Sequence, residues 1–145
     1  MIAAPLLAQP STDDVTPDVQ RLYAEAKTAE QQDDSSTAIA KYRTILRISP
    51  DLAPAYNNLG MLYFKRHDYP QAVLVLEQGL KIKEDMPTAI AMLGLSYSEL
   101  GDDRKAEPLL RHALRADAGN EDVKLSLAHV LLALGKNPGS SPTVE

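Results

Sequence analysis

Residues 53–86 read APAYNNLGMLYFKRHDYPQAVLVLEQGLKIKEDM, and this stretch decides the fold because its pattern recurs 34 residues away on both sides. Ala72 lies midway between Ala38 and Ala106 at that step. Further columns keep the same step: Leu59, Leu93 and Leu127; Gly60, Gly94 and Ala128; Tyr42, Leu76 and Leu110; Leu46, Leu80 and Leu114; Asp34, Asp68 and Asp102. Several independent columns with one period indicate an internal repeat, which determines the architecture.

Each repeat unit carries two apolar stripes at helical spacing, separated by turn residues. In residues 53–86, Leu59 and Tyr63 lie on the first stripe, and Ala72 and Leu76 lie on the second. We predict an all-α chain of three helical pairs followed by a single helix that copies the first half of a unit. The predicted boundaries are residues about 19–52, 53–86 and 87–120 for the pairs, and 121–134 for the final helix, which caps the third pair.

Close helix crossings are expected at two columns of small residues: Ala38, Ala72 and Ala106 in the second helices, and Gly60 and Gly94 in the first helices. Small side chains let two helix axes approach each other. The larger residues Tyr42, Leu76 and Leu110 are then expected to fill the space between successive pairs. A single pair cannot cover its apolar face, so the pairs stack, and stability is a sum of unit and interface contributions.

Helix ends are marked by capping residues and prolines. Thr16 and Pro17 predict the first helix start, because a Thr hydroxyl caps well and proline at the first position loses no needed N–H. Asp68 is placed to cap the second helix of its pair. Pro108 lies just beyond the first turn of a helix that starts at Asp103, so we expect a local kink or a later start there.

The ends of the chain differ in composition from the repeats. The ordered domain is predicted at residues 16–135, with a flexible leader at 1–15 and a disordered tail at 136–145. The leader resembles the last residues of a secretory signal, with small residues around Ala8, but it lacks the positive and long apolar regions of one. A leader of a cytosolic protein stays open as the alternative. The balance leans slightly toward an exported or periplasmic protein.

Composition excludes several classes of partner and chemistry. The chain has 145 residues, 44% of them hydrophobic and 24% charged, with a net charge of −5. Basic and acidic residues are interspersed, so no phosphate-binding patch is expected and nucleic acid is disfavoured. There is no Cys in the sequence, which excludes disulfides. No apolar stretch approaches the roughly 20 residues of a membrane-spanning helix.

The 34-residue period, with small residues at two fixed columns, resembles that of the tetratricopeptide repeat (TPR) family. Residues 53–86 match best through Tyr56, Leu59, Gly60, Tyr63, Ala72 and Leu76, and the resemblance covers about residues 17–134. Gly79 stands where the family usually has Ala, and the closing proline is replaced by Glu84 and Ala118 in the second and third units. The resemblance implies a right-handed TPR solenoid of three helix-turn-helix repeats and a capping helix.

Catalytic and metal-binding constellations are not expected. The three histidines, His67, His112 and His129, are far apart and match no metal-ligand spacing, so neither a metal nor a cofactor is predicted. The acidic pairs at 33–34, 102–103 and 121–122 stand where helices begin, so capping and the helix dipole account for them. No serine has a positioned base. We therefore expect a protein that is not an enzyme.

In the TPR family the first helix of each pair lines a concave surface, and the resemblance implies a partner-binding groove there. The expected groove residues are Tyr23, Lys27, Asn57, Asn58, Met61, Phe64, Lys65, Ala91, Leu95, Ser98, Leu125 and His129. Met, Phe and Leu in this set form a more apolar stripe than a solvated face requires, which favours a bound peptide or helix. Coverage by neighbouring helices or by the leader stays open as the alternative.

Two binding modes of the family can be compared with the sequence. Some members grip a chaperone's C-terminal carboxylate with Lys, Asn and Arg at set columns; here Asn58 matches, but Tyr23, Lys27, Thr88 and Met92 occupy the other columns. The clamp is therefore expected to be absent. A second mode, similar to that of O-GlcNAc transferase, uses a ladder of Asn residues, which Met92 and Ser126 would interrupt.

The sequence thus predicts a non-catalytic protein- or peptide-interaction module that binds a partner segment in its concave groove. One alternative is a structural protein that self-associates into a homo-oligomer through this surface or through an uncapped end of the solenoid. Another is an accessory subunit of a cell-envelope complex. The partner class is protein or peptide in each case.

Overall fold

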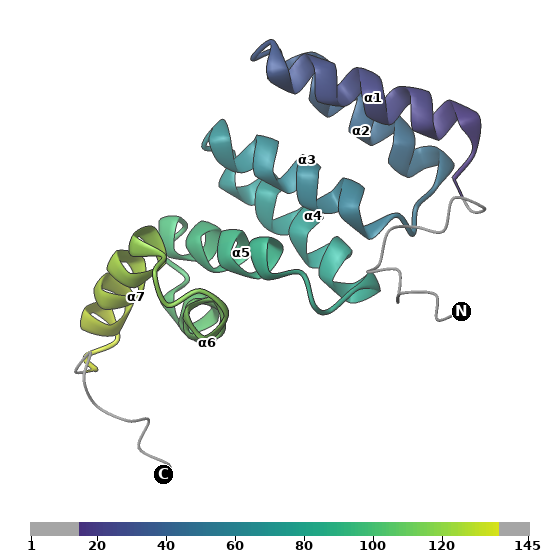
Figure 1. Ribbon diagram of the computed structural model, residues 1–145. Coiled ribbons are helices and arrows are strands. Elements are labelled where there is room, and N and C mark those ends of the chain that lie inside the picture. The colour runs from purple at the N-terminus through teal and green to yellow at the C-terminus, as the bar shows by residue number, and fades with distance from the viewer. Residues whose placement is uncertain (1–14, 137–145) are drawn as a thin grey trace.

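The computed structural model describes residues 15–136, so the predicted leader and tail lie almost wholly outside the described residues. Seven helices follow one another in this part of the chain: α1 Pro17–Gln31, α2 Ser35–Ile48, α3 Ala53–Lys65, α4 Tyr69–Ile82, α5 Pro87–Glu99, α6 Asp103–Ala116 and α7 Glu121–Ala133. They form three antiparallel pairs and a terminal single helix (Figure 1). This is the all-α helical repeat that the 34-residue period predicts.

The turn inside each pair has one backbone solution that recurs with the sequence period. Asp33, His67 and Gly101 have φ values of 56°, 58° and 76°, and Gly135 after α7 has 70°. These positions are also 34 residues apart, and each places a left-handed residue directly after a helix. Asp33 and His67 adopt a conformation that glycine takes at lower cost, so the backbone of the turn is imposed by the packing of the pair.

Aspartate caps follow these turns at the expected positions. Asp34 Oδ1 accepts the Thr37 backbone N–H at 3.1 Å, and this bond lowers the pKa of the Asp34 carboxyl. Asp68 and Asp102 cap α4 and α6 in the same way. The acidic pairs therefore act as helix-start residues.

The helix that contains Pro108 departs from one expectation. α6 begins at Asp103 and continues through Pro108, so the later start is wrong. Proline has no N–H, so the carbonyl of Arg104 lacks its partner four residues on. Pro108 is exposed, which leaves that carbonyl close to solvent.

The two helices of a pair cross where the small residues lie. Ala38, Ala72 and Ala106 are each 0% exposed. A Cβ added to Gly60 would lie 2.5 Å from Cγ of Leu76, and Leu110 lies over Gly94 in the same way in the next pair. Leu76 and Leu110, expected to fill the space between pairs, thus also cover the glycine of their own pair. The absence of a glycine side chain sets how closely the helices approach.

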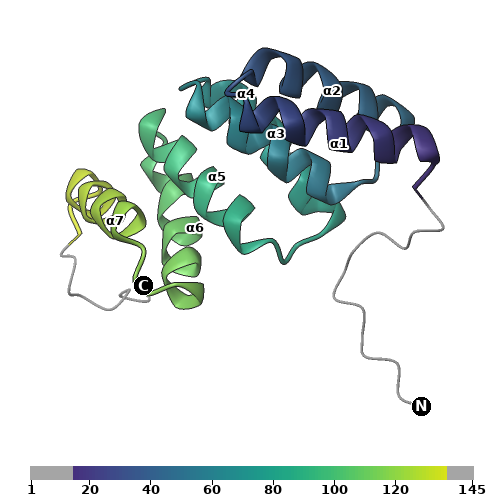
Figure 2. The ribbon, with the colours of Figure 1, turned by 45° about the horizontal axis from the view of Figure 1, so that its top comes forward.

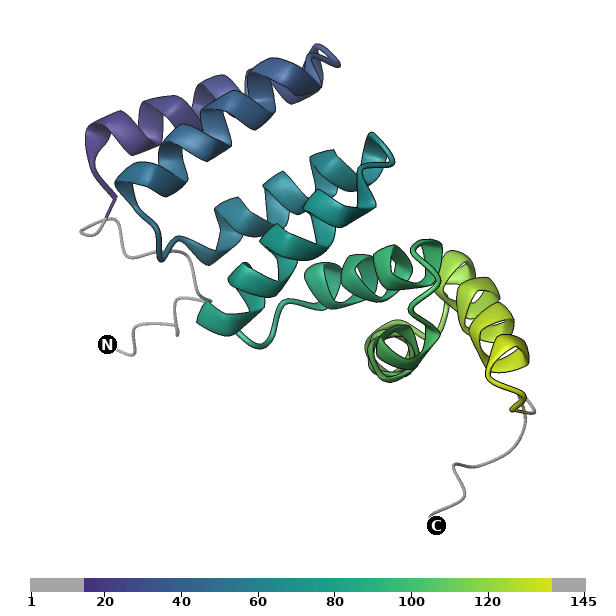
Figure 3. The same ribbon diagram turned by 180° about the vertical axis from the view of Figure 1, so that it is seen from behind.

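The pairs stack into a solenoid whose successive first helices lie on one face. α3 lies against α5, and α5 lies against α7. In Figure 2, α1, α3, α5 and α7 follow one another across the molecule, and Figure 3 shows the second helices α2, α4 and α6 from behind. The first stack is looser, because no Cα atom of α1 comes within 8 Å of α3 among the described helices. The pair α1–α2 meets the next pair through α2 and α3.

An ion-pair cluster holds the last helix in place. Glu107 on α6 is largely buried and accepts from Arg111 Nε at 3.1 Å and from Lys136 Nζ at 2.7 Å. These two cations, Lys136 more strongly, hold the pKa of Glu107 below its ordinary value. Lys136 directly follows α7, so the cluster fixes the end of the chain's last helix to α6.

Replacing Gly60 with alanine tests the crossing. Because Leu76 is 0% exposed and cannot swing away, Gly60→Ala should lower the free energy of unfolding by about 1–3 kcal/mol. Chemical denaturation followed by circular dichroism measures this change. Gly119→Ala is the matched control, because its added Cβ would meet only Asp117 Oδ1 at an ordinary 3.4 Å. Equal stability of the two variants would contradict the proposed packing.

Candidate functional site

A polar network joins the first two pairs and takes up several of the predicted groove residues. Tyr42 of α2 is 0% exposed, and its hydroxyl donates to Glu30 Oε1 at 2.5 Å. Asn58 Nδ2 donates to the Tyr23 hydroxyl and, at 3.3 Å, to that of Tyr42. Lys27 pairs with Glu30 at 3.4 Å. Tyr23, Asn58 and Lys27 therefore have partners inside the molecule.

Burial controls the charge state of the network. It raises the pKa of Tyr42 well above the ordinary range, and the hydrogen bond to Glu30 raises it further. Burial also raises the pKa of Tyr23, whose ring meets that of Tyr42 edge-on with centroids 5.4 Å apart. Both tyrosines are thus neutral donors at physiological pH. The network ties α1 to α2 and α3 through side chains where the backbones of α1 and α3 stay apart.

A cavity of about 320 Å³, here named the inner cavity, opens between α3, α5 and the α6–α7 turn. Its floor is formed by Phe64 of α3 with Ala91, Met92 and Leu95 of α5. These side chains are partly buried and pack on the core with one side. Three of the predicted groove residues, Phe64, Ala91 and Leu95, therefore lie together around one apolar depression.

The rim of the inner cavity is polar and acidic. Asp117 and Asn120 border it from the α6–α7 turn, and Asp122 from the first turn of α7. No lysine or arginine is among the residues that line this cavity. The site thus offers apolar contact and negative charge to an incoming group, at the columns Thr88 and Met92 where a carboxylate clamp would need cations.

The other predicted groove residues lie apart from the inner cavity. Lys65 borders a separate cavity of about 180 Å³ together with Glu30, Asp33 and Arg66. Leu125 of α7 is 61% exposed, and His129 is exposed on the same helix. Met61 and Ser98 are partly buried between the helices.

Asn57 is distinguished by its unmatched carbonyl. Its Oδ1 atom is buried and has no hydrogen-bond partner in the described part of the chain. A buried acceptor without a donor costs free energy. Asn57 occupies the same repeat column as Ala91, which lines the inner cavity.

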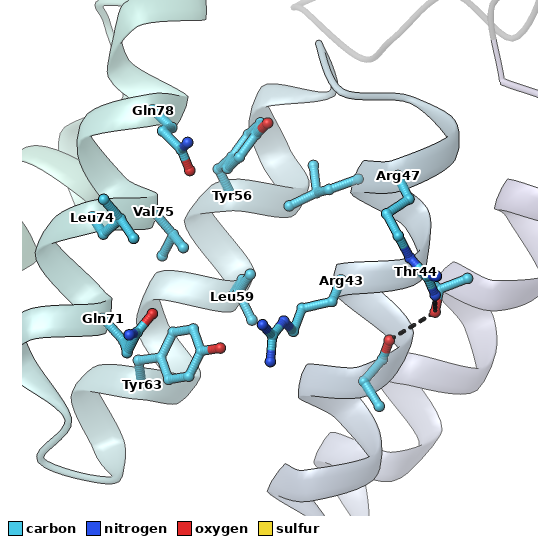
Figure 4. A pocket seen from close by; sticks show the side chains of 12 residues that line it. Arg43, Thr44, Arg47, Tyr56, Leu59, Tyr63, Gln71, Leu74, Val75 and Gln78 are labelled. Atoms are coloured by element: carbon cyan, nitrogen blue, oxygen red, sulfur yellow. Dashed lines mark hydrogen bonds between the residues drawn. The ribbon is translucent and has the colours of Figure 1, made fainter.

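A larger cavity, here named the outer cavity, lies on the face of the second helices (Figure 4). It has a volume of about 660 Å³ and is bounded by α2, α3 and α4. Arg43 and Arg47 reach it from α2, Tyr63 from α3, and Gln71 and Gln78 from α4. No acidic residue lines it.

The periodic columns did not reveal the outer cavity, because three helices must be placed before it exists. One local feature pointed to it. Arg43 and Arg47 are four residues apart on one helix face, which is an unfavourable like-charge spacing. Neither arginine forms an ion pair with a carboxylate of residues 15–136, and Arg47 donates only to Thr44 Oγ1, at 3.0 Å.

The next interface along the solenoid has no such opening. There the Tyr97 hydroxyl donates to Glu77 Oε1, joining α5 to α4. Burial, and after it the Glu77 carboxylate, raises the pKa of Tyr97 from its ordinary 10.0 to about 12. This bond closes the same column of the structure in which Arg43 and Tyr63 stand one repeat earlier.

The stacked helical pairs with small residues at their crossings define an α-solenoid repeat protein. Family models of the tetratricopeptide repeat match residues 41–73 and 87–120. Among solved structures, the MamA protein superposes with a TM-score of 0.76 at 18% identity over 82% of this chain and 65% of its own. The first TPR of Spaghetti (RPAP3), bound to the HSP90 peptide SRMEEVD, gives 0.75 at 16% identity over 84% and 98%. The chain belongs to the tetratricopeptide repeat family.

One curated relative is similar in sequence. The cellulose synthase 2 operon protein C of Komagataeibacter xylinus is 31% identical over 126 residues, which is 86% of this chain. The match covers only 10% of that protein's length, so the chain spans about a tenth of this relative.

Two searches of the described residues complete the description of the site. Within residues 15–136 no group of three or more His, Cys, Asp or Glu side chains is arranged to hold a metal ion. None of the seven described helices combines the length and the apolarity needed to cross a membrane.

The Tyr97–Glu77 bond predicts a loss of stability at alkaline pH. An unfolded tyrosine ionises near pH 10, whereas folded Tyr97 keeps its proton to about pH 12. Above pH 10 the unfolded chain therefore holds fewer protons, and the contribution present below pH 10 is lost up to about pH 12. Thermal unfolding across this range should show a falling Tm, with a shallower fall for Tyr97→Phe. Parallel curves for the two proteins would contradict the assignment.

Proposed function

We propose that this chain is a non-catalytic protein-interaction module that holds a segment of a partner protein in the inner cavity. The observation that supports this function is the apolar floor of Phe64, Ala91 and Leu95 beside an acidic rim. The floor joins α3 to α5, so a bound segment would lie across successive first helices. Structural neighbours of the same fold bind peptides, as the HSP90-peptide complex illustrates.

The chemistry of the inner cavity favours a segment with apolar and basic side chains. An apolar side chain would fill the floor, and a Lys or Arg beside it would meet Asp117 and Asp122. The peptide in the RPAP3 complex, SRMEEVD, carries three carboxylate side chains. An acidic peptide of that kind would be repelled here, because no cation lines the cavity.

The relative's name provides a setting for this function. Cellulose synthase 2 operon protein C is matched by this chain over a tenth of its length. We infer that the partner belongs to a polysaccharide-synthesis assembly of the cell envelope, with this chain as an accessory interaction subunit. An exported or periplasmic location follows from that setting.

Leu95 provides the test of the inner cavity. The probe is a fluorescein-labelled peptide in which leucine alternates with lysine. Leu95→Glu places a charge on the apolar floor and should weaken its binding at least about tenfold, as measured by fluorescence anisotropy. Ile82→Glu is the matched control, since Ile82 is 45% exposed on α4 and lines no described cavity. Binding that Leu95→Glu leaves unchanged, with helical circular dichroism intact, would remove the inner cavity as the site.

A second candidate function, self-association, is favoured by α7. Leu125 and Leu132 on this helix are 61% and 67% exposed, the highest values among the large apolar residues described. α7 has no second helix of its own unit to pack on it within the described residues. A second copy could cover these leucines, because a solenoid end is a stacking surface.

Light scattering tests self-association. The mass of the wild-type chain should rise with concentration if α7 stacks on another copy, and the double variant Leu125→Gln with Leu132→Gln should remain monomeric. These leucines are exposed, so the substitution should leave the Tm nearly unchanged. A monomer at every wild-type concentration would exclude this function.

A further inference from the structure

The outer cavity brings together two hydrogen-bond donors that have no acceptor. Arg43 extends from α2, and Tyr63 extends from α3 with only 8% of its surface exposed. Figure 4 shows the guanidinium of Arg43 and the hydroxyl of Tyr63 pointing toward one another across the cavity. The Tyr63 hydroxyl donates to no group in the described range 15–136. Two donors facing one space favour an incoming anion.

The next repeat shows what an acceptor does in this place. Glu77 and Tyr97 stand 34 residues after Arg43 and Tyr63, and there the carboxylate accepts the tyrosine hydroxyl. The carboxylate that closes the interface of α4 with α5 is replaced by a cation between α2 and α3. The earlier interface therefore lacks one carboxylate, and an external one would complete the same arrangement with charge-assisted bonds.

The remaining walls favour a peptide over a free small anion. Leu74 lies on the cavity wall with 53% of its surface exposed, and Leu59 and Val75 line the interior. A carboxylate alone would leave Leu74 in water, whereas an aliphatic side chain next to it would cover this residue. Gln71 and Gln78 flank Leu74 on the same face of α4, where their amides can bond to peptide backbone groups.

We propose that the outer cavity is a second binding site, specific for an acidic segment of a partner protein that alternates carboxylate and aliphatic side chains. The carboxylate of that segment binds between Arg43 and Tyr63, and its aliphatic side chain packs on Leu74 and Val75. Arg47, four residues from Arg43, adds positive charge at the entrance. Charge complementarity assigns this occupant, since two arginines and no acid line the cavity of a chain with a net charge of −5.

The test uses the full chain and two labelled peptides, one alternating leucine with glutamate and the other leucine with glutamine. The wild-type chain should bind the glutamate peptide more tightly in fluorescence anisotropy. Arg43→Gln should weaken that binding about tenfold, the usual effect of losing a charge-assisted bond. Arg104→Gln is the matched control, because it makes the same charge change at an exposed position of α6 that lines no described cavity.

A charge reversal separates binding from structure. Arg43→Glu installs the carboxylate of the next repeat, so it should abolish binding of the glutamate peptide while the Tm stays equal to or above that of the wild-type chain. Arg104→Glu should leave the affinity unchanged. Glutamate-peptide binding that survives Arg43→Glu would overturn the proposal, and so would a Tm that falls well below the wild-type value.

Amide chemical shifts of the wild-type chain locate the bound peptide without any variant. The glutamate peptide should shift the signals of Leu59, Tyr63 and Val75. Shifts confined to Ala91 and Leu95 would place it in the inner cavity and overturn the proposal. Self-association without peptide that Arg43→Gln removes would assign the outer cavity to a second copy, with the same consequence. Leu95→Glu should leave glutamate-peptide binding intact, so the two cavities fail or succeed separately.

Discussion

The close crossing of the two helices within each pair is the constraint on which the rest of the structure depends. Leu76 covers Gly60 and Leu110 covers Gly94, and in each case a single added methyl group would overlap the leucine. This contact fixes the second helix against the first, so all first helices present one face and all second helices present another. Both cavities are consequences, since each is bounded by helices of two neighbouring pairs.

The repeat period fixes backbone positions but leaves the chemistry of each interface free. Residues 43 and 77 occupy the same place in successive units, yet one is arginine and the other glutamate. The glutamate accepts from Tyr97 and joins α4 to α5, whereas the arginine meets the donor Tyr63 beside an open cavity. An identical scaffold thus produces a closed joint and an open one. The difference lies in one side-chain charge, which the backbone pattern does not constrain.

The periodic columns were sufficient to predict the fold because they report directly on helix contacts. Ala72 is buried, Asp68 caps α4, and α7 starts at Glu121 as the pattern requires. The candidate site was harder to predict, since the inward column does not say which side chains bond to each other. Tyr23 and Asn58 were placed in the groove, but in the structure they bond to each other across two pairs. Only part of the expected apolar stripe gathers at the inner cavity, because the path of the solenoid decides which columns converge.

The loose joint between the first two pairs gives the outer cavity a thermodynamic role as well as a recognition role. α1 and α3 do not approach each other, so the first pair is held by α2, by the Tyr42 network and by whatever fills the outer cavity. In a solenoid, the strength of each interface adds directly to stability. A carboxylate bound between Arg43 and Tyr63 would supply the acceptor that Glu77 supplies one repeat later. Binding there would therefore strengthen the weakest stack and stiffen the solenoid that presents the inner cavity.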